Sequence, residues 1–254
     1  MRGFGSFLRK EFVEIFKTWR LWVLPGIVFF FALSGPIIAQ LTPQLLESVA
    51  GSQPGVVFQI PDPTFTDSYL QWAKNLGQIV TFAIIIIYGG LVSAERKSGT
   101  AILVLTKPVS RPAFVVAKFV SQAVMLCVTV VVGALMTWGV TYGIFGEAPI
   151  GVLAEVTGLY LATAVMFLAM MTLFSVMVNS QAGAAGLGLG FFLLVSIASL
   201  WGPALEFSPA GLMNAPTELL VDSVRDLLWP LVTTGAVAVL SVAGGAFAFT
   251  RKEL

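Results

Sequence analysis

The chain has 254 residues, of which 57% are hydrophobic and only 11% are charged. Soluble globular domains carry about a quarter of their residues as charged side chains, so this composition excludes an ordinary soluble domain and indicates an all-α polytopic membrane protein. With no histidine and a single cysteine, Cys127, the chain lacks the commonest general base and metal ligand and cannot form an internal disulfide.

Residues 4–20 predict an amphipathic helix that lies in the membrane interface. Their apolar side chains recur at i, i+3 and i+4 spacing, and charged side chains occupy the other face. Basic helices that also carry aromatic side chains typically bind in this position. A signal-peptide start is the alternative, but no small-residue cleavage pattern closes the apolar run convincingly. Residues that represent the two faces are Arg9, Lys10, Phe12 and Phe16.

Long uncharged runs then predict six membrane-spanning helices, because about 20 apolar residues cross the hydrocarbon core of a bilayer. The longest run, residues 156–205, is too long for one helix and divides at the polar residues 179–181. Pro36 and Pro43 are expected to mark the end of the first helix. The predicted spans are residues 21–40, 75–94, 117–143, 152–178, 183–201 and 227–250.

The basic residues are distributed unequally between the two sides of the predicted bundle. Of the 14 Lys and Arg residues, all but Lys74 and Arg225 fall on the side that carries both termini and the loop of residues 95–116. Cytoplasmic loops carry an excess of Lys and Arg, so we expect this side to be cytoplasmic, with the chain in the cell (inner) membrane. The other connections, residues 41–74 and 202–226, are then extracytoplasmic, with short helices expected at residues 64–74 and 219–228.

The sequence lacks the residue patterns of an enzyme or of an ion-coupled carrier. It has no Walker-type glycine loop, no metal-binding cluster and no pair of carboxylates at membrane depth. Every acid and base maps to a loop or an interface, whereas ion-coupled transporters usually place ionisable side chains within the bilayer. We therefore expect no catalytic residue, metal or cofactor in this chain, and an energy source that lies elsewhere.

Residues 95–118 form the largest block of charge and contain turn signals that the flanking spans lack. Residues 98–100 can turn the chain and cap a short helix over residues 101–105. Pro108 ends that helix, and Ser110 can cap the next one, which runs on into the third span. The pattern predicts a helix-break-helix unit joined directly to the second and third spans.

This loop is similar to a motif of ABC-2 type transporter permeases, the membrane subunits of prokaryotic ABC exporters. The motif has an acidic residue, Gly-Thr, a leucine-rich run and Pro-Val-Ser-Arg. Lys118 follows at the family's usual lysine position, Arg9-Lys10-Glu11 resembles the family's elbow helix, and residues 249–254 resemble its aromatic, basic and acidic tail. The matching loop residues are Glu95, Gly99, Thr100, Pro108, Ser110 and Arg111.

The resemblance implies a type V exporter-like permease fold and a mechanism. Two permease subunits, identical or paired, would bind two copies of a separate cytoplasmic ATPase that holds ATP and Mg. The loop would dock in a groove on the ATPase and pass its movement to the second and third spans. The long external segment 47–74 has no counterpart, which leaves the branch of the family open. The implied coupling residues are Glu95, Gly99, Thr100, Ile102, Leu103, Leu105, Pro108, Ser110 and Arg111.

Several of these residues have a simpler interpretation. Ile102, Leu103 and Leu105 either contact the ATPase or dip into the lipid interface. The charged residues of the loop either pair with the ATPase or the elbow helix, or serve only as positive-inside anchors: Glu95, Arg96 and Arg111.

Export of an amphipathic or lipid-like substrate is the function that we expect, because the spans are rich in Phe, Met and Trp. The alternative is a permease that transmits ATPase work to an extracytoplasmic partner, as in family members linked to metalloenzyme maturation. A third interpretation is a passive membrane anchor for a cytoplasmic complex. In the fifth span, a small-residue face that includes Gly186 and Gly190 either packs within one subunit or forms a subunit interface.

Overall fold

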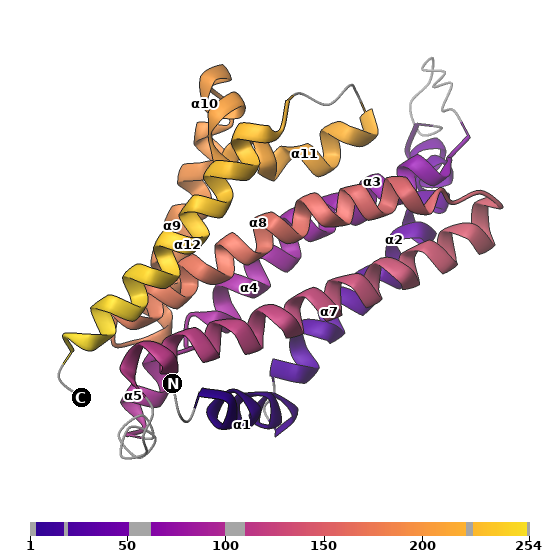
Figure 1. The fold of residues 1–254 in the computed structure, drawn as a ribbon. Helices are drawn as coiled ribbons and strands as arrows, with labels where there is room; N and C mark the ends of the chain where they lie inside the picture. Colours follow the sequence, from indigo (N-terminus) through magenta and orange to yellow (C-terminus); the bar gives the residue numbers. More distant parts are fainter. Residues whose placement is uncertain (1–3, 18–19, 51–61, 100–109, 222–225, 253–254) are drawn as a thin grey trace.

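The computed structural model describes residues 4–17, 20–50, 62–99, 110–221 and 226–252. All regular structure in these ranges is helical, and six stretches within them are long and apolar enough to cross a membrane. The predictions of an all-α fold and of six spans are therefore confirmed. The helices (Figure 1) are α1 Phe4–Lys17, α2 Arg20–Ala50, α3 Phe65–Asn75, η1 Leu76–Val80, α4 Thr81–Tyr88, α5 Ser93–Lys97, α7 Arg111–Phe145, α8 Ile150–Met177, α9 Gln181–Ala198, α10 Gly202–Phe207, α11 Pro209–Val221 and α12 Leu228–Thr250.

The long helices run side by side and define two ends of a bundle (Figure 1). One end, called the terminal end here, carries both termini, α1, α5 and the start of α7. The other, called the opposite end, carries α10, α11 and the connection between α7 and α8. Helix α1 lies across the terminal end instead of running along the bundle.

Helix α2 continues through the two prolines at which the first span was expected to end. Pro36 lacks the N–H that would bond to the carbonyl of Ala32 one turn earlier. The hydroxyl of Thr137, in α7, donates to that carbonyl instead, at 3.3 Å. Neighbouring helices and hydroxyl side chains often satisfy such backbone groups in membrane helices, so the predicted boundary at residue 40 was wrong, and the helix also passes Pro43.

The second span is a long helical stretch that contains a π turn. It begins at Phe65, inside the segment predicted to be an external loop, and not at residue 75. The short helix expected at residues 64–74 is its first part, α3. Residues Leu76–Val80 form the π turn η1, and Thr81 Oγ1 donates to the carbonyl of Leu76 at 3.1 Å. Such turns are rare and occur frequently at functional sites.

Between α4 and α5 the chain turns against the neighbouring helices α8 and α9. A Cβ on Gly89 would lie 2.8 Å from the carbonyl oxygen of Gln181, so this close approach requires glycine. The backbone N–H groups of Val92 and Ser93 both donate to Oγ of Ser175 in α8, at 2.9 and 3.0 Å. These bonds fix the position of α5 at the terminal end.

Burial differs strongly between the spans. In the most apolar window, 72% of the residues are buried inside the chain for the second span and 61% for the fourth, against 22% for both the fifth and the sixth. Within the larger of two buried apolar clusters, the second and fourth spans contribute large aromatic side chains that are 2% exposed or less: Tyr69, Trp72, Tyr88, Tyr160 and Phe167. The second and fourth spans are therefore central, and the last two are peripheral.

The small residues of α9 divide between two faces. A Cβ on Gly188 would lie 2.8 Å from Cγ2 of Ile85, so this glycine allows close packing inside the chain. A Cβ on Gly186 or on Gly190 would meet open space. Packing within one subunit therefore explains Gly188, and nothing in the described part of the chain covers the other two.

The segment of residues 202–226 is mostly helical and is not an open loop. Helices α10 and α11 pack against α12, and α11 also packs against α8. The amphipathic helix predicted at residues 219–228 is not continuous, because the chain is non-helical at Asp226 and the N–H of Leu228 donates to the Asp226 carboxylate at 3.0 Å. That bond marks the start of α12.

Candidate coupling site

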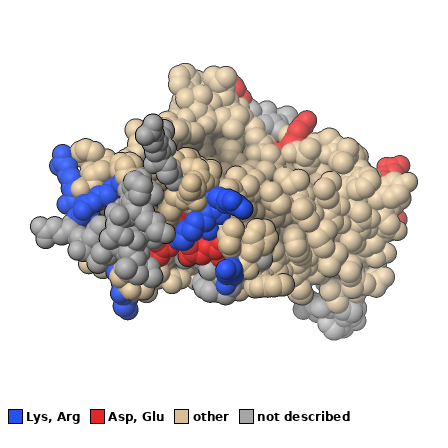
Figure 2. Space-filling model, turned by 60° about the horizontal axis from the view of Figure 1, so that its bottom comes forward, with Lys and Arg blue, Asp and Glu red and all other residues tan. Residues whose placement is uncertain are grey.

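Charged side chains from α1, α5 and α7 gather at the terminal end of the bundle. Glu95 and Arg96 lie on α5, which leads into the predicted coupling loop, and Arg111 begins α7 on the other side of that loop. On this face, basic side chains surround an acidic centre (Figure 2). The cluster therefore joins segments that are far apart in the sequence.

Lys118 of α7 is the central residue of this cluster. Its side chain is 2% exposed, and Nζ lies 2.9 Å from Oε2 of Glu11, which is itself 3% exposed. Lys118 also forms an ion pair with Glu95. Breaking a buried ion pair by removing one partner costs about 3–5 kcal/mol. These three residues therefore hold α1 and α5 against α7.

The burial of Lys118 corrects one expectation from the sequence. We expected every charged residue in a loop or at an interface, and this was wrong for Lys118, which is enclosed by protein within a long helix. Two carboxylates neutralise the ammonium group and accept its hydrogen bonds, which makes its burial tolerable. Lys118 lies close to the start of α7, at the terminal end of the bundle.

Lys10 of α1 adds a second ammonium group to the cluster. Its Nζ lies 3.1 Å from the Glu11 carboxylate and also pairs with Glu14. Burial alone lowers the pKa of Lys10, but the hydrogen bond to Glu14 and the charges of Glu11 and Glu95 outweigh that effect and raise the pKa above its ordinary value. The ammonium therefore stays protonated at physiological pH.

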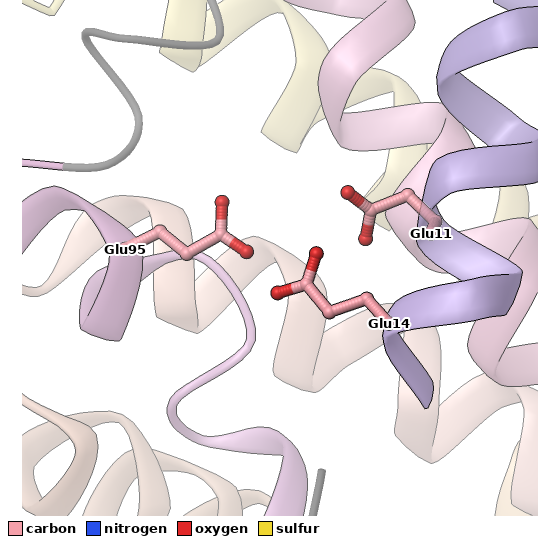
Figure 3. A group of neighbouring side chains, drawn as sticks. All are labelled: Glu11, Glu14 and Glu95. Carbon is pink, nitrogen blue, oxygen red and sulfur yellow. The ribbon is translucent and has the colours of Figure 1, made fainter. Parts of the chain in front are cut away.

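Three carboxylates of this cluster point toward one another (Figure 3). Oxygens of Glu11, Glu14 and Glu95 lie within 4.8 Å of one another, a spacing at which they could hold a metal ion. However, Lys118 and Lys10 already pair with all three carboxylates. We therefore assign the group as an ion-pair cluster.

An aromatic stack lies beside the ion pairs and joins the same helices. The ring of Phe114 in α7 stacks on Phe7 of α1 and on Phe249 of α12, with centroids 5.4 Å apart in both pairs. Nζ of Lys118 lies 5.1 Å from the Phe114 centroid, within the range of a cation–π contact. The stack adds apolar contact to the charged one, so α1, α7 and α12 are held as one unit.

Two cations hold the end of α8. Arg96 donates to the carbonyl of Val176 at 3.0 Å and to Oδ1 of Asn179 at 2.8 Å, and Nζ of Lys252 donates to the carbonyl of Met177 at 2.6 Å. The last carbonyls of a helix lack partners within it and carry partial negative charge. Burial, and then the positive charge of Arg96, lower the pKa of Lys252. Helix α5 and the chain end are thus both attached to α8.

Arg111 attaches the start of α7 to the end of the chain. Its Nη1 donates to the carbonyls of Thr250 and Lys252, at 3.1 and 2.8 Å. Oγ of Ser110 accepts from the N–H of Ala113 at 3.4 Å, so Ser110 caps α7 as the sequence predicted. Both sides of the coupling loop are therefore anchored to other helices, α5 to α8 and α7 to the end of α12.

The structure places only part of the predicted coupling loop. Gly99 has a φ of +73°, in the left-handed region that favours glycine, and it turns the chain after α5. Glu95, Ser110 and Arg111 occupy the positions given above. The other predicted coupling residues lie outside the described residues: Thr100, Ile102, Leu103, Leu105 and Pro108.

The faces of α1 differ from the predicted ones. Its buried stripe consists of Phe7, Glu11 and Ile15, whereas Phe16 is 70% exposed. The sequence analysis did not identify Glu11 as buried, although an acid between two apolar residues at i−4 and i+4 signals a buried cationic partner. Of the other residues predicted for this helix, Phe12 is half-buried, and Arg9 and Lys10 are exposed.

Comparison with known proteins identifies the family. A family model described as "ABC-2 family transporter protein" matches residues 6–254. The chain belongs to this family. It is also similar to the "Uncharacterized transmembrane protein YxlG" of Bacillus subtilis (strain 168), with 22% identity over 256 residues that cover 100% of this chain and 99% of that protein.

Family membership defines the general role of this ABC-2 chain. It is a multi-pass membrane protein and a transport subunit of the permease type, which is not itself catalytic. Membership also implies an ABC ATPase as partner. The charge cluster at the terminal end therefore belongs to the membrane subunit of a transporter.

Proposed function

We propose that this ABC-2 permease couples ATP hydrolysis by a separate ATPase to export of an amphipathic or lipid-like substrate. The observation that carries the proposal is the double anchoring of the loop between α5 and α7. On one side, Glu95 pairs with Lys118 and Arg96 holds the end of α8. On the other side, Arg111 holds the end of α12. Movement of the loop is therefore transmitted to α1, α7, α8 and α12 together.

In this proposal the terminal end faces the cytoplasm, where the ATPase binds. The excess of Lys and Arg on that side supports the orientation. Two copies of the ATPase, with ATP and Mg bound to them, serve two permease subunits. The open face of Gly186 and Gly190 on α9 is suited to close approach of a second subunit.

The ATPase contact is assigned to the apolar residues of the loop, Ile102, Leu103 and Leu105. Two described features frame this segment: the left-handed turn at Gly99 and the capped helix start at Ser110. A segment held at both ends loses less conformational freedom on binding than a free one. The two ends of the loop are thus already held in place when the ATPase binds.

A lipid-like substrate is supported by an apolar groove between α7 and α8. The groove has a volume of about 240 Å³ and is lined by residues that include Val131, Leu135, Trp138, Gly158 and Leu161. Both helices are membrane spans. A groove of this kind is suited to an acyl chain or another apolar group and offers no site for an ion.

The test uses the permease and its ATPase reconstituted together in lipid vesicles. We expect Leu103→Asp to leave the permease folded, while ATPase assembly or ATP-dependent export is lost. The control is Leu200→Asp, since Leu200 is 85% exposed at the opposite end and should not contact the ATPase. Full assembly with undiminished export in Leu103→Asp would contradict the coupling role. Assembly and ATP-driven movement of the subunit without movement of any substrate would favour work on an extracytoplasmic partner instead.

A further inference from the structure

The apolar groove between α7 and α8 runs into the bundle from its opposite end, where these two helices are connected (Figure 1). On α8 its lining extends from Ile150 to Leu161, which is about 16 Å along the helix axis. On α7 it extends from Trp138 inward to Val131. The described residues that line the groove are all uncharged. The groove is therefore a site for an apolar tail, with one end close to the membrane surface.

Glu155 of α8 lies beside the groove, although it is not one of the lining residues. It is a neighbour of Gly158 on the helix surface, at i and i+3, and Gly158 lines the groove. Helix α8 has 28 residues and is about 42 Å long, which matches the thickness of a bilayer with its headgroups. Glu155 lies about 8 Å from the start of α8, at the boundary between headgroups and hydrocarbon. Its carboxylate is thus at the level of a lipid headgroup.

The carboxylate of Glu155 has no partner among the residues that the structure describes. Glu155 is exposed, and no described side chain forms an ion pair or a hydrogen bond with it. Lys74 is the described basic residue at this end, and it lines a separate hollow between α2 and α3 together with Asp67. Ionisable side chains within membrane spans are costly and usually pair with another charge. Within the described part of the chain, Glu155 is therefore an uncompensated negative charge beside an apolar groove.

An aromatic side chain in the groove is a second group that attracts cations. Trp138 lines the groove, and its Nε1 donates to the carbonyl of Ala148 at 2.9 Å. Its ring also stacks on Tyr142, with centroids 6.1 Å apart, so two contacts fix its position. The face of a tryptophan ring attracts ammonium groups. The carboxylate and the aromatic ring both favour a ligand with a positively charged headgroup.

We propose that the groove binds a cationic amphiphile from the leaflet at the opposite end. Its ammonium group pairs with Glu155, and its apolar tail lies between α7 and α8. Gly158 leaves room for the tail beside the carboxylate, because a Cβ at this position would meet open space. This inference rests on the proposed function and narrows the substrate class from lipid-like molecules in general to amphiphiles that carry a positive charge.

The first test measures binding to the permease alone, in nanodiscs of phosphatidylcholine. The probe is dodecylamine with a photoreactive diazirine in its tail, because an alkyl ammonium group stays protonated at neutral pH. Mass spectrometry after illumination measures how labelling of α7 and α8 depends on the concentration of the probe. We expect saturable labelling of the groove. A dodecyl sulfate that carries the same diazirine should bind about tenfold more weakly, since it lacks the charge that pairs with Glu155.

Two variants with matched controls test the two parts of the site. Glu155→Gln should weaken binding of the amine about tenfold, whereas Glu206→Gln removes the same charge from an exposed position on α10 and should have no effect. Gly158→Leu should abolish labelling of the groove, because the new side chain occupies the space of the tail. Gly151→Leu is its control in the same helix, since its Cβ also meets open space and it does not line the groove.

Three binding results would overturn the inference. Equal labelling by the two probes would show that the groove selects only the tail. An equal loss in Glu155→Gln and Glu206→Gln would show general attraction between charges, and unchanged labelling in Gly158→Leu would place the probe elsewhere.

A second test measures ATP-dependent export of the amine by the permease reconstituted with its ATPase, and it separates this inference from the proposed function. Export that is undiminished in Gly158→Leu would overturn the inference and leave the proposed function standing. Selective binding in the groove without export of the amine would support the binding site and contradict the proposed export function.

Discussion

The two ends of the bundle are held together by different chemistry. At the terminal end, ion pairs around Lys118 and hydrogen bonds from cations to helix carbonyls connect α1, α5, α7, α8 and α12. At the opposite end, neutral groups make the connections, such as the hydroxyls of Ser68 and Thr141 at 2.7 Å. Trp138 likewise donates to the carbonyl of Ala148 at 2.9 Å.

This difference separates an end that can respond to a partner from an end that keeps its shape. Charge interactions extend over several ångströms and change when another charged surface approaches. Neutral hydrogen bonds act at contact distance and depend mainly on packing. In the proposed function, the end with the coupling loop is therefore the one whose internal bonds the ATPase perturbs. The four variants below test this contrast, from the largest expected effect to the smallest.

The largest effect is expected for Lys118→Met. The change leaves the buried carboxylates of Glu11 and Glu95 without their shared partner, so the free energy of unfolding should fall by about 3–5 kcal/mol. Thermal unfolding of the purified protein in nanodiscs measures the change. Lys17→Met, at an exposed lysine of α1, should have little effect. Adding Glu11→Gln to Lys118→Met should restore part of the loss, and a loss that stays unchanged would argue against the cluster.

Gly133→Ala tests the part of α7 that depends on packing. A Cβ at this position would lie 2.6 Å from Cγ1 of Val28 and 2.8 Å from Cη2 of Trp72, so α7 would have to move away from α2 and α3. Overpacking of this kind costs about 1–3 kcal/mol. Gly139→Ala is a matched control in the same helix, because its Cβ would meet open space. Equal stability of the two variants would show that Val28 and Trp72 can move away from an added methyl group at little cost in free energy.

Thr137→Val tests the bond that supports the proline in α2. The variant keeps the shape of the side chain but removes the donor to the carbonyl of Ala32, which Pro36 leaves without a helical partner. Hydrogen bonds between membrane helices contribute about 1 kcal/mol, and we expect a loss of that size. The loss should not depend on salt. Thr233→Val, at a hydroxyl that bonds within its own helix, should have a smaller effect.

Arg96→Gln should have the smallest effect on stability, below about 1 kcal/mol, because the side chain is partly exposed and such charged contacts are weak. The difference from the wild type should shrink further in high salt, in contrast to Thr137→Val. Thermal unfolding at two salt concentrations measures both variants. An equal response of both to salt would remove the distinction that we draw between the two ends.

The sequence was sufficient for the number of spans and for several local signals. Five uncharged runs, of which one is long enough for two spans, predicted six helices, because hydrocarbon thickness imposes a minimum length on each. Ser110 before Arg111-Pro112 predicted the capped start of α7, since a hydroxyl cap followed by proline is a local pattern. Both signals lie within a few residues of the feature that they predict.

The features that the sequence did not reveal depend on contacts between distant segments. A proline normally ends a helix, but α2 continues through Pro36. The reason becomes visible only from the position of Thr137, which bonds to the carbonyl that Pro36 leaves free. Similarly, the ion pair of Lys118 with Glu11 joins residues that are far apart in the chain, so neither residue alone predicts its burial. Such partners become visible only once the helices are placed side by side.

The π turn in the second span determines the phase of the whole helix. An α-helix advances about 100° per residue, so in a regular helix Tyr69 and Tyr88 would point about 100° apart. The π turn contains one residue more than a regular α-helical turn, and this residue removes the 100° offset between the two side chains. As a result, four large side chains from both sides of the turn are fully buried in the same core: Tyr69, Trp72, Ile84 and Tyr88. The residue that interrupts the regular helix is thus the one that keeps its buried side continuous from one end of the bundle toward the other.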